Sequence, residues 1–450
     1  MIQRDPVLSP PAMQAGSQTR TIANFRWYIC GLLFYATTVN YMDRLVIGIL
    51  KPTITHDLHW TESDYARVTT FFQLGYALMM PVAGRLIDWL GLRVGYPLAA
   101  TLWSFSSIAH AFAGNVFEFS IARLGLGLGE AANFPSAIKA VADWFPRKER
   151  ALATGIFNSG SNIGAVVAPL TIPIVVVKFG WHSAFVFTGL MSLTFAIVWA
   201  LVYREPEQQR FLSKAELAYI RSDSDAAAAV VKIPYFQLLR KRAAWAFLLG
   251  KFLIDPVWWF YLFWLPGFLN EKYHVDLVHL GPPLVAIYLA ADIGSIGGGW
   301  LSSFLLKIGW RVGRARKTAM LVCALAVISV IFVPLAGGNL WVTVTLVAIA
   351  ASAHQGWSAN IYTVASDCFP RAAIGSVVGL GGLGGALGGV LVQPAVGWWL
   401  DHTGKSYSLL FVVAGSMYLL ALLIIQLLLP RYEQETVKRE NQDTDHGWNV

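Results

Sequence analysis

The stretch Ser183–Val202, SAFVFTGLMSLTFAIVWALV, runs for twenty residues without a charged side chain. An α-helix needs about 20 mostly apolar residues to cross a bilayer, so this stretch predicts a membrane span. The run is long and lacks the period-two alternation of a membrane β-barrel strand, so it indicates a helix. The fold class then depends on how many such stretches the chain contains.

Eleven further apolar stretches occur along the 450-residue chain. The twelve predicted spans cover residues 27–50, 65–89, 95–115, 117–140, 151–174, 183–202, 244–268, 281–305, 318–337, 340–366, 375–399 and 408–429. A polar stretch, 203–243, divides them into six and six, and weakly repeated loop motifs relate the two halves. We therefore predict an all-α polytopic membrane protein with twelve transmembrane helices in two pseudo-symmetric six-helix bundles. The bundles are expected at 27–202 and 244–429, with a central loop at 203–243 and tails at 1–26 and 430–450.

The composition agrees with a membrane protein. Hydrophobic residues make up 56% of the chain and charged residues only 13%, about half of the roughly 25% in an average globular chain. This excludes a disordered chain and disfavours a soluble enzyme. The net charge of +8 could indicate a nucleic-acid partner. We prefer the explanation that cytoplasmic loops of membrane proteins collect Lys and Arg.

The distribution of positive charge predicts the orientation. A cytoplasmic N-terminus places most of the 34 Lys and Arg residues on the cytoplasmic side, and the reverse orientation would violate the positive-inside rule. Both termini are therefore expected in the cytoplasm. The first 25 residues are polar, so no cleavable signal peptide is expected. The three cysteines form no C-x-x-C, so neither a disulfide framework nor a zinc site is indicated.

The first and fourth predicted spans carry charged side chains, which are costly in lipid and persist where they face a cavity or a partner. Asn40, Asp43 and Arg44 share one helical face. Arg123 and Glu130 lie two turns apart, and Arg44 and Arg123 both lie roughly 9 Å below the membrane surface. Two guanidiniums at one depth make a natural carboxylate site, because Arg pairs with a carboxylate through a planar fork. Structural pairing of these charges is the other explanation, although a buried pair adds little stability by itself.

A carboxylate whose Arg partner can be captured by an incoming anion would couple anion binding to protonation. Asp292, in the eighth predicted span, is a further intramembrane carboxylate with no obvious partner, and its role is left open. Lys251 and Asp255 form an i,i+4 pair in the seventh span, where a structural or gating bridge is favoured over substrate contact. Pro256 next to them predicts a kink.

Aromatic and polar side chains in two other spans could line a cavity. Trp258, Trp259 and Tyr261 lie well inside the seventh span, which favours cavity lining over an interfacial aromatic belt. His354, in the tenth span, is either a hydrogen-bonded structural residue or a contact for sugar hydroxyls. Glycines at high density in the eleventh span, from 375 to 389, allow close helix approach. No ATP-binding, nucleophile or metal motif accompanies them, so an enzyme is not indicated and transport would use an existing gradient.

Three sets of motifs resemble a known family. The loop Gly84–Arg93, GRLIDWLGLR, resembles the signature between spans two and three of the major facilitator superfamily. Within that superfamily, the resemblance is to the anion:cation symporter family. Four stretches carry it, namely Asn40–Arg44 (NYMDR), Arg123–Pro135, Trp144–Arg150 (WFPRKER) and Phe157–Gly160 (FNSG). Two more resemble bacterial hexuronate transporters, namely Asp255–Tyr261 (DPVWWFY) and Ala353–Gln355 (AHQ).

The resemblance implies proton-coupled uptake of a hexuronate, such as galacturonate or glucuronate, by alternating access across the inner (plasma) membrane. It assigns the substrate carboxylate to Arg44 and proton handling to Asp43 and Glu130, and it pairs Arg123 with Glu130. The expected substrate-binding residues are Arg44, Tyr41, Tyr76, Arg123, Asn158, Ser161, Trp258, Tyr261, His354, Gln355 and Asn360. The expected gating residues are Gly84, Asp88, Arg93, Arg147, Arg150, Lys251 and Asp255.

The sequence departs from the resemblance at two positions. Ser161 stands where galactonate-type carriers can place Gln, and Ser303 replaces the Asp of the usual second-half loop signature. The alternative is therefore a symporter or exchanger for another organic anion, such as galactonate or glucarate. The expected partners are the anionic substrate, protons and the bilayer, with no cofactor, no metal and no nucleic acid, and a monomer is expected.

Overall fold

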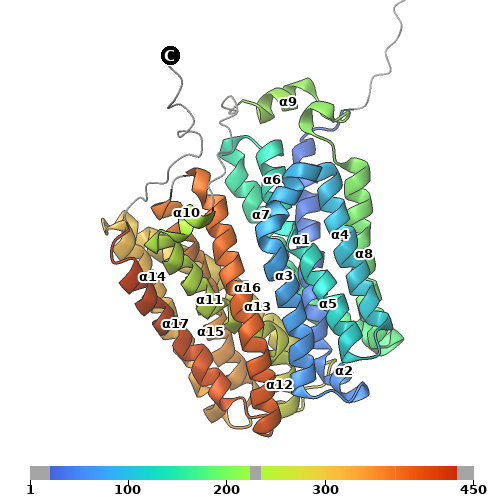
Figure 1. Cartoon of the computed structure of the whole chain (residues 1–450), viewed down its shortest axis with the longest axis vertical. Coiled ribbons are helices and arrows are strands. Elements are labelled where there is room, and N and C mark those ends of the chain that lie inside the picture. Colours follow the sequence, from blue (N-terminus) through green and yellow to red (C-terminus); the bar gives the residue numbers. More distant parts are fainter. Residues whose placement is uncertain (1–20, 223–234, 370, 433–450) are drawn as a thin grey trace, which may run out of the picture.

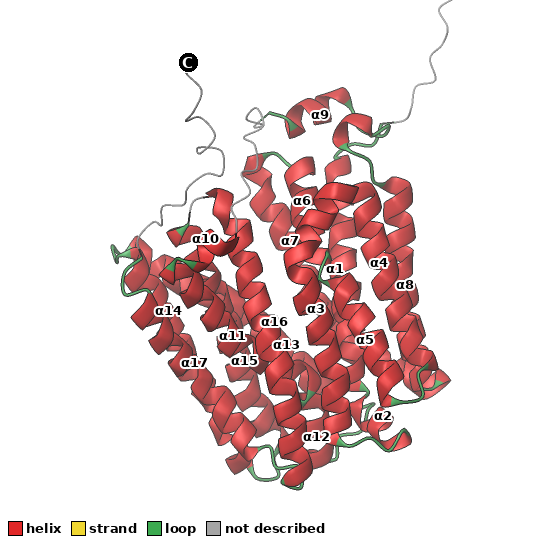
Figure 2. Cartoon of the chain, viewed as in Figure 1, coloured by secondary structure: helices red, strands yellow, loops and turns green. Residues whose placement is uncertain are grey.

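The computed structural model describes residues 21–222, 235–369 and 371–432 of the chain. Every regular element within these ranges is a helix, as Figure 2 shows. The sequence accounts for the ends of several helices. A capping box between Thr61 and Asp64 begins one of them. Gly91 and Gly180, with φ values of 72° and 80°, end two others where a left-handed backbone is required.

The first half contains eight α-helices and one short 3₁₀ helix. They are α1 (Phe25–Ile49), α2 (Lys51–Asp57), α3 (Glu62–Leu90), α4 (Leu92–Ala109), η1 (His110–Phe112), α5 (Val116–Glu130), α6 (Asn133–Trp144), α7 (Arg147–Phe179) and α8 (Trp181–Val202). The polar segment that follows holds η2 (Pro206–Gln208), α9 (Lys214–Ile220) and α10 (Tyr235–Leu239). The second half holds α11 (Arg242–Phe263), α12 (Leu265–Tyr273), α13 (Gly281–Lys307), α14 (Val312–Val327), η3 (Ile328–Ala336), α15 (Leu340–Cys368), α16 (Arg371–His402) and α17 (Ser408–Leu428).

The prediction of twelve transmembrane helices in two bundles is confirmed. Some predicted spans are built from two consecutive helices, such as α5 with α6 and α14 with η3. Within the described residues, seven helical stretches are long and apolar enough to cross a membrane, and one of them is α14 together with η3. Helices α1 and α3 are not among them, because polar side chains lower their hydropathy.

The two halves repeat one local feature. Helix α1 breaks at Leu50 and continues as the short α2, and α11 breaks at Trp264 and continues as the short α12. A proline lies in the first turn of each short helix, Pro52 in α2 and Pro266 in α12. A proline is tolerated there because its missing N–H would have no partner inside the helix. The short helices therefore mark corresponding positions in the two halves.

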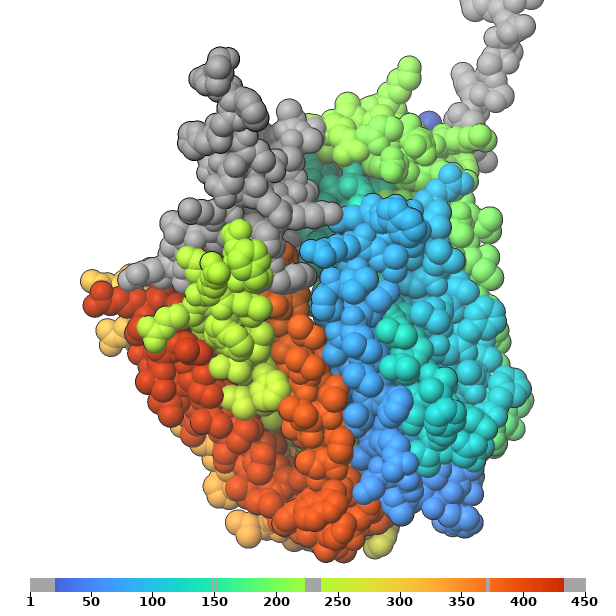
Figure 3. All heavy atoms as spheres, in the orientation of Figure 1, coloured from blue at the N-terminus to red at the C-terminus, as the bar shows by residue number. Residues whose placement is uncertain are grey.

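The halves meet mainly along two helix pairs, α3 with α16 and α7 with α13. Figure 3 shows α16 lying directly against α3 on the visible face. Glycines of α16 allow this approach. A Cβ added at Gly397 would lie 2.4 Å from the Cβ of Ala66, and one at Gly389 would lie 2.9 Å from the side chain of Gln73. The glycine-rich stretch therefore brings the halves together, as small residues do between membrane helices.

The two ends of the molecule can be named by their short helices. Figure 1 shows α9 and α10 at one end, where both ends of the described chain also lie, and α2 and α12 at the opposite end. We call these the α9/α10 end and the α2/α12 end.

Candidate functional site

Arg44 lies near the end of α1, and its side chain forms a buried ion pair. Its Nε and Nη2 atoms donate hydrogen bonds of 3.0 Å and 2.7 Å to the same oxygen, Oε2, of Glu130. Glu130 is the last residue of α5, immediately before the chain turns into α6. The Arg44 side chain is only 6% exposed, and Oε1 of Glu130 has no hydrogen bond to any described residue. One carboxylate oxygen therefore carries the whole interaction.

Four aromatic rings surround the Arg44 guanidinium. Its central carbon lies 4.9–5.3 Å from the ring centroids of Tyr41, Phe72, Tyr76 and Trp259. These distances fall within the range of cation–π attraction. Trp259 belongs to α11, whereas the other three rings come from the first half. The ion pair therefore lies where the two halves meet. We call Arg44, Glu130 and these four rings the arginine cage.

Arg123, on α5, is fully buried next to this cage. Its central carbon lies 5.7 Å from the ring centroid of Phe72, a ring that Arg44 also contacts. None of its three side-chain nitrogens has a hydrogen bond to a described residue. Burying such donors without partners is costly. The pairing of Arg123 with Glu130 that the resemblance implied is therefore not formed in this conformation, where Glu130 contacts Arg44 instead.

Asp43 points in a different direction from its neighbour Arg44. It accepts a hydrogen bond of 2.6 Å from Ser107 on α4 and one of 2.5 Å from Ser192 on α8. The carboxylate is thus satisfied inside the first half and has no contact with the arginine cage. The shared helical face expected for these two residues does not bring them to one place, because consecutive helical residues point about 100° apart.

The expected second-half binding residues form a separate cluster. The rings of Trp258 and His354 stack with centroids 4.9 Å apart, and His354 also hydrogen-bonds the hydroxyl of Tyr418. Tyr261 is fully buried, and its hydroxyl has no partner among the described residues. Asn360 donates hydrogen bonds of 2.9 Å to the carbonyls of Gly298 and Gly356, so it fastens α13 to α15.

Other expected residues have looser surroundings. Gln355, on α15, is half-buried, and Asn158, on α7, is exposed. Ser161 is buried, and its hydroxyl donates a 2.7 Å hydrogen bond to the carbonyl of Asn158 in its own helix. Lys251 pairs with Asp255 at 2.8 Å and donates a hydrogen bond of 3.2 Å to Tyr362, so the predicted bridge within the seventh span is formed.

The expected gating residues at the α9/α10 end make contacts within the first half. Asp88 pairs with Lys139 at 2.7 Å, and both side chains are partly exposed. Arg150 donates to the carbonyls of Phe145 and Ala142, at the end of α6. Gly84 is half-buried and Arg93 is exposed. The side chain of Arg147 lies outside the described part of the chain.

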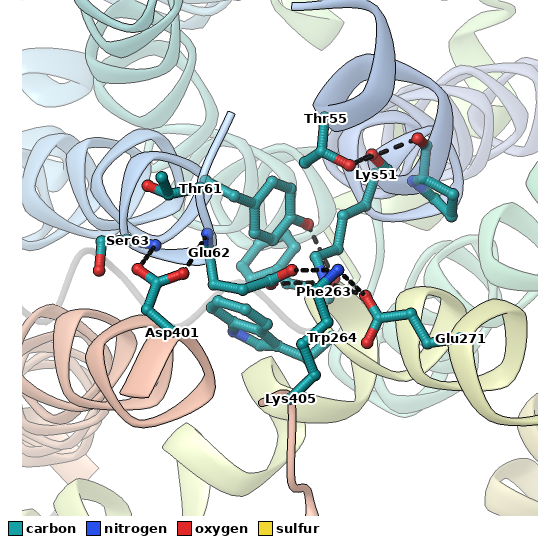
Figure 4. A network of polar contacts seen from close by, with 12 residues as sticks. Lys51, Thr55, Thr61, Glu62, Ser63, Phe263, Trp264, Glu271, Asp401 and Lys405 are labelled. Carbon is teal, nitrogen blue, oxygen red and sulfur yellow. Dashed lines mark hydrogen bonds and ion pairs between the residues drawn. The ribbon is translucent and has the colours of Figure 1, made fainter. Parts of the chain in front are cut away.

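A network that the sequence did not reveal joins the halves at the α2/α12 end. Figure 4 shows the amine of Lys51 between the carboxylates of Glu62 and Glu271, at distances of 2.7 Å and 3.3 Å. Lys405 reaches the same two carboxylates at 3.1 Å and 3.2 Å. Lys51 and Glu62 come from the first half, whereas Glu271 and Lys405 come from the second. These four residues form what we call the crossing network, and Lys51 is only 1% exposed within it.

Two further contacts reinforce the crossing network. The carboxylate of Asp401, at the end of α16, accepts hydrogen bonds of 2.8 Å and 2.9 Å from the backbone amides of Glu62 and Ser63, at the start of α3. An acidic group is favourable at a helix N-terminus. Burial alone would lower the pKa of Lys405, but the carboxylates of Glu271 and Glu62 outweigh it and raise that pKa. Lys405 therefore stays charged at neutral pH.

No sequence signal singled out the residues of the crossing network. Its residues are charged groups just outside or at the edges of predicted spans, where charges are ordinary and predict no particular contact. Trp264 lies at the break between α11 and α12. Its indole donates a 2.5 Å hydrogen bond to the side-chain oxygen of Gln393 on α16, so this contact also joins two helices of the second half.

Known proteins resemble this chain in sequence and in fold. The family model described as Major Facilitator Superfamily matches residues 33–392 and 308–447. The hexuronate transporter of Escherichia coli (strain K12) is 32% identical over 410 residues, which cover 90% of this chain and 94% of that protein. The galacturonate transporter of Dickeya chrysanthemi is 35% identical over 289 residues, covering 64% of this chain and 84% of its own length. Among solved structures, a D-xylose-proton symporter superposes with a TM-score of 0.70 at 16% identity, covering 91% of this chain and 99% of that one.

Proposed function

This chain belongs to the major facilitator superfamily and is a membrane transporter rather than an enzyme, and from that premise we propose that it takes up a hexuronate together with protons. Galacturonate and glucuronate are the substrates we favour, because the relatives described above carry hexuronate and galacturonate in their names. Uptake proceeds by alternating access across the inner membrane. The α9/α10 end, with both termini, faces the cytoplasm, because the Lys and Arg residues concentrate there.

The arginine cage is the observation that carries this proposal. A guanidinium held at the interface between two halves, in a site from which water is largely excluded, strongly favours an anionic partner. In this conformation Glu130 serves as that partner. A sugar-acid carboxylate has the same planar shape and charge as the Glu130 carboxylate, so it can take the same place. The surrounding rings offer apolar faces against which a sugar ring can pack.

Exchange of partners supplies the coupling. When the substrate carboxylate takes Arg44, Glu130 loses its cation and accepts a proton in the low-dielectric site, or pairs with the neighbouring Arg123. Arg123 is suited to this because its nitrogens have no other hydrogen bond among the described residues. Either outcome changes the charge balance at the interface when substrate arrives. The Asp43 carboxylate already accepts hydrogen bonds from two serines. We propose that it affects the charge balance at the arginine cage only from a distance.

The crossing network serves as the outer gate of the cycle. With the α2/α12 end on the periplasmic side, the ion pairs of Lys51 and Lys405 hold the halves together on that side. Substrate would then enter the site from the periplasm only after these pairs separate. The expected cytoplasmic gating residues are proposed to make the corresponding contacts in the opposite state. The binding roles of Asn158, Ser161, Trp258, Tyr261, His354, Gln355 and Asn360 stay predictions.

The proposal is tested by uptake of labelled galacturonate into proteoliposomes with an imposed proton gradient. The wild-type protein should accumulate galacturonate, and Arg44→Lys should abolish uptake, because an ammonium cannot reproduce the paired hydrogen bonds of a guanidinium. Lys139→Arg is the matched control, since it changes an exposed cation away from the cage. Uptake by Arg44→Lys at the wild-type rate would remove Arg44 from the binding site.

The same assay distinguishes hexuronate–proton symport from the alternative, a carrier or exchanger for another organic anion. Galactonate and glucarate are offered in place of galacturonate, with and without the proton gradient. Preferred uptake of either one would replace the hexuronate assignment. Exchange that ignores the gradient would replace proton symport.

A further inference from the structure

The second half carries an ion pair of its own on α11. The amine of Lys251 lies 2.8 Å from a carboxylate oxygen of Asp255, one helical turn further along, and 3.2 Å from the hydroxyl of Tyr362 on α15. The same amine lies 4.7 Å from the centroid of the Tyr362 ring. We call these three residues the lysine cluster. The sequence favoured a structural or gating bridge for the pair, and its surroundings indicate a further role.

The lysine cluster shares one face of α11 with the arginine cage. Lys251, Asp255 and Trp259 are spaced by four residues, so they follow one another along one side of the helix. Trp259 is a wall of the arginine cage, with its ring centroid 5.2 Å from the central carbon of the Arg44 guanidinium. Helix α11 begins at the α9/α10 end, so Asp255 lies one turn, about 6 Å, from Trp259 towards that end.

Contacts between α3 and α16 give the depth of Tyr76, another ring of the cage. A Cβ added at Gly389 would lie 2.9 Å from the side chain of Gln73, and one at Gly382 would lie 2.7 Å from the side chain of Met80. The two helices therefore run in opposite directions along this contact. Tyr76 lies between Gln73 and Met80, so it is level with residues 385–386 of α16.

Asp255 lies at the same depth as Tyr76. A Cβ added at Gly385 would overlap the carboxylate of Asp255, so this carboxylate occupies space that only a glycine leaves open. Gly385 is at the level of Tyr76 on the neighbouring α3. The lysine cluster and the arginine cage therefore lie at overlapping depths on the two sides of the boundary between the halves.

The lysine cluster also interacts with the cage across this boundary. The hydroxyl of Tyr362 is close enough to those of Tyr41 and Tyr76 for an electrostatic interaction, and Lys251 is close enough to that of Tyr41. The Asp255 side chain is 17% exposed and Tyr362 is 41% exposed. Because these groups face the first half, their exposed surface is accessible to a molecule held between the halves.

We propose that the lysine cluster binds the end of the sugar acid remote from its carboxylate and determines which acids are accepted. This inference rests on the proposed binding of a hexuronate to Arg44. A hydroxyl both donates and accepts hydrogen bonds, so it can donate to the Asp255 carboxylate and accept from the Lys251 amine. The single helical turn between Trp259 and Asp255 is similar in length to a sugar ring.

Asp255 makes the cluster select monocarboxylates over dicarboxylates. Galacturonate ends in hydroxyls at the remote end, whereas galactarate carries a second carboxylate there. Asp255 already neutralises Lys251, so a second carboxylate must displace Asp255 or lie beside a like charge. A like charge placed against an unwanted substrate is a general route to specificity. Removal of the Asp255 charge alone should therefore turn the cluster into a site for a second carboxylate.

Competition in proteoliposomes tests this role. Uptake of labelled galacturonate is measured against increasing unlabelled galacturonate or galactarate, for the wild-type protein, Asp255→Asn and the double variant Lys251→Met/Asp255→Asn. We expect the wild-type protein to prefer galacturonate. Asp255→Asn should lower this preference by roughly tenfold, because Lys251 can then bind the second carboxylate of galactarate. Asp276→Asn, which removes an exposed carboxylate at the α2/α12 end, is the matched control and should keep the preference.

The double variant separates charge from structure. With neither charge present, galactarate has no cation to bind, so the preference for galacturonate should return towards the wild-type value. The remote hydroxyls lose both partners, so the affinity for galacturonate should fall by roughly tenfold while the maximal rate of exchange stays the same. The double variant also leaves no unpaired buried charge, so it should fold even where Asp255→Asn does not.

The outcomes separate this inference from the proposed function. A wild-type protein that takes up no galacturonate contradicts the proposed function. Wild-type uptake with equal inhibition by the two acids overturns the role of Asp255, as does an unchanged preference in Asp255→Asn. A double variant that keeps the low preference of Asp255→Asn contradicts the charge argument. Should Asp255→Asn fail to insert, the double variant decides, because wild-type affinity for galacturonate in that protein would show that the lysine cluster does not contact the substrate.

Discussion

The two ends of this molecule hold their charges differently. At the α2/α12 end, ion pairs join the two halves, between the buried Lys51 and the partly exposed Glu271 and between the half-exposed Lys405 and the buried Glu62. At the α9/α10 end, no ion pair between described residues joins the first half to the second, and the pair of Asp88 with Lys139, for example, lies within the first half. One end is thus fastened across the interface and the other is not. Under the proposed alternating-access cycle, the present conformation is the state that is closed at the α2/α12 end.

The ion pairs at the two ends also differ in burial, and therefore in how much their loss would destabilise the structure. Lys51 is 1% exposed in its pair with Glu62, whereas Lys139 and Asp88 are 34% and 47% exposed. Removing one partner from a buried pair costs about 3–5 kcal/mol, because the other charge is left without compensation. An exposed pair contributes about 0–1 kcal/mol. Substitutions at the two ends should therefore have very different effects.

The largest effect is expected from Lys51→Met. It leaves Glu62 and Glu271 with only the half-exposed Lys405 as a shared cation, so the closed α2/α12 end should lose about 3–5 kcal/mol. Spin labels on cysteines placed at His56 and Asp276, which are exposed on either side of the boundary, report the separation of the halves. We expect the distance between the labels to increase and galacturonate uptake to fall at least tenfold.

Lys139→Met is the control for this comparison. It removes a cation of the same kind from the exposed pair at the other end, and the label distance should stay unchanged. Equal opening in both variants would show that the crossing network does not hold the halves together.

An intermediate effect is expected from Gly397→Ala on α16. The new methyl group would lie 2.4 Å from the Cβ of Ala66 and 2.7 Å from the carbonyl oxygen of Glu62, so α3 and α16 must move apart. Overpacking of this kind costs about 1–3 kcal/mol. The label distance should increase less than in Lys51→Met, and the melting temperature in detergent should fall by several degrees.

Gly375→Ala provides the contrast within the same helix. A Cβ there meets no atom within 4 Å, so only the helix-favouring effect of Ala remains. We expect its melting temperature to stay the same or rise slightly. A larger loss of stability in Gly375→Ala than in Gly397→Ala would contradict the conclusion that α16 packs tightly against α3 at Gly397 and not at Gly375.

The smallest effect is expected from Asp401→Asn. Asp401 accepts hydrogen bonds from the first backbone amides of α3. An amide side chain keeps an acceptor but loses the charge, so we expect a loss of about 0.5–1 kcal/mol. Thermal unfolding should detect a small decrease, and Asp88→Asn at the other end should produce none. A decrease as large as that of Lys51→Met would mean that Asp401, rather than the lysines, fastens this end.

Most of the fold was predictable from the sequence. Apolar stretches as long as Ser183–Val202 permit little except a membrane helix, and the charges inside the first and fourth spans pointed to Arg44, Arg123 and Glu130. Their pairing was not predictable, because it depends on how α1 and α5 are rotated against each other. Asp43 lies one residue before Arg44 and yet bonds to serines on α4 and α8. Sequence spacing gives a residue's place on its own helix and not which neighbouring helix it meets.

The crossing network was hidden for a related reason. Lys51 and Lys405 are separated by most of the chain, and each lies beside a span end, where charged residues are common. Only the packing of α3 against α16 and of α2 against α12 brings them to the same carboxylates. The sequence indicated gating residues in the loop after the second span because a known motif lies there. No comparable motif marks the other end.

Accumulation and exchange of labelled galacturonate by Glu130→Gln in proteoliposomes test the central claim most directly. Gln keeps an oxygen that can accept hydrogen bonds from Arg44, but it cannot bind and release a proton. We predict that this variant exchanges internal for external galacturonate and no longer accumulates it under a proton gradient. Accumulation at the wild-type level would contradict the account, because Glu130 would then have no part in coupling substrate to protons.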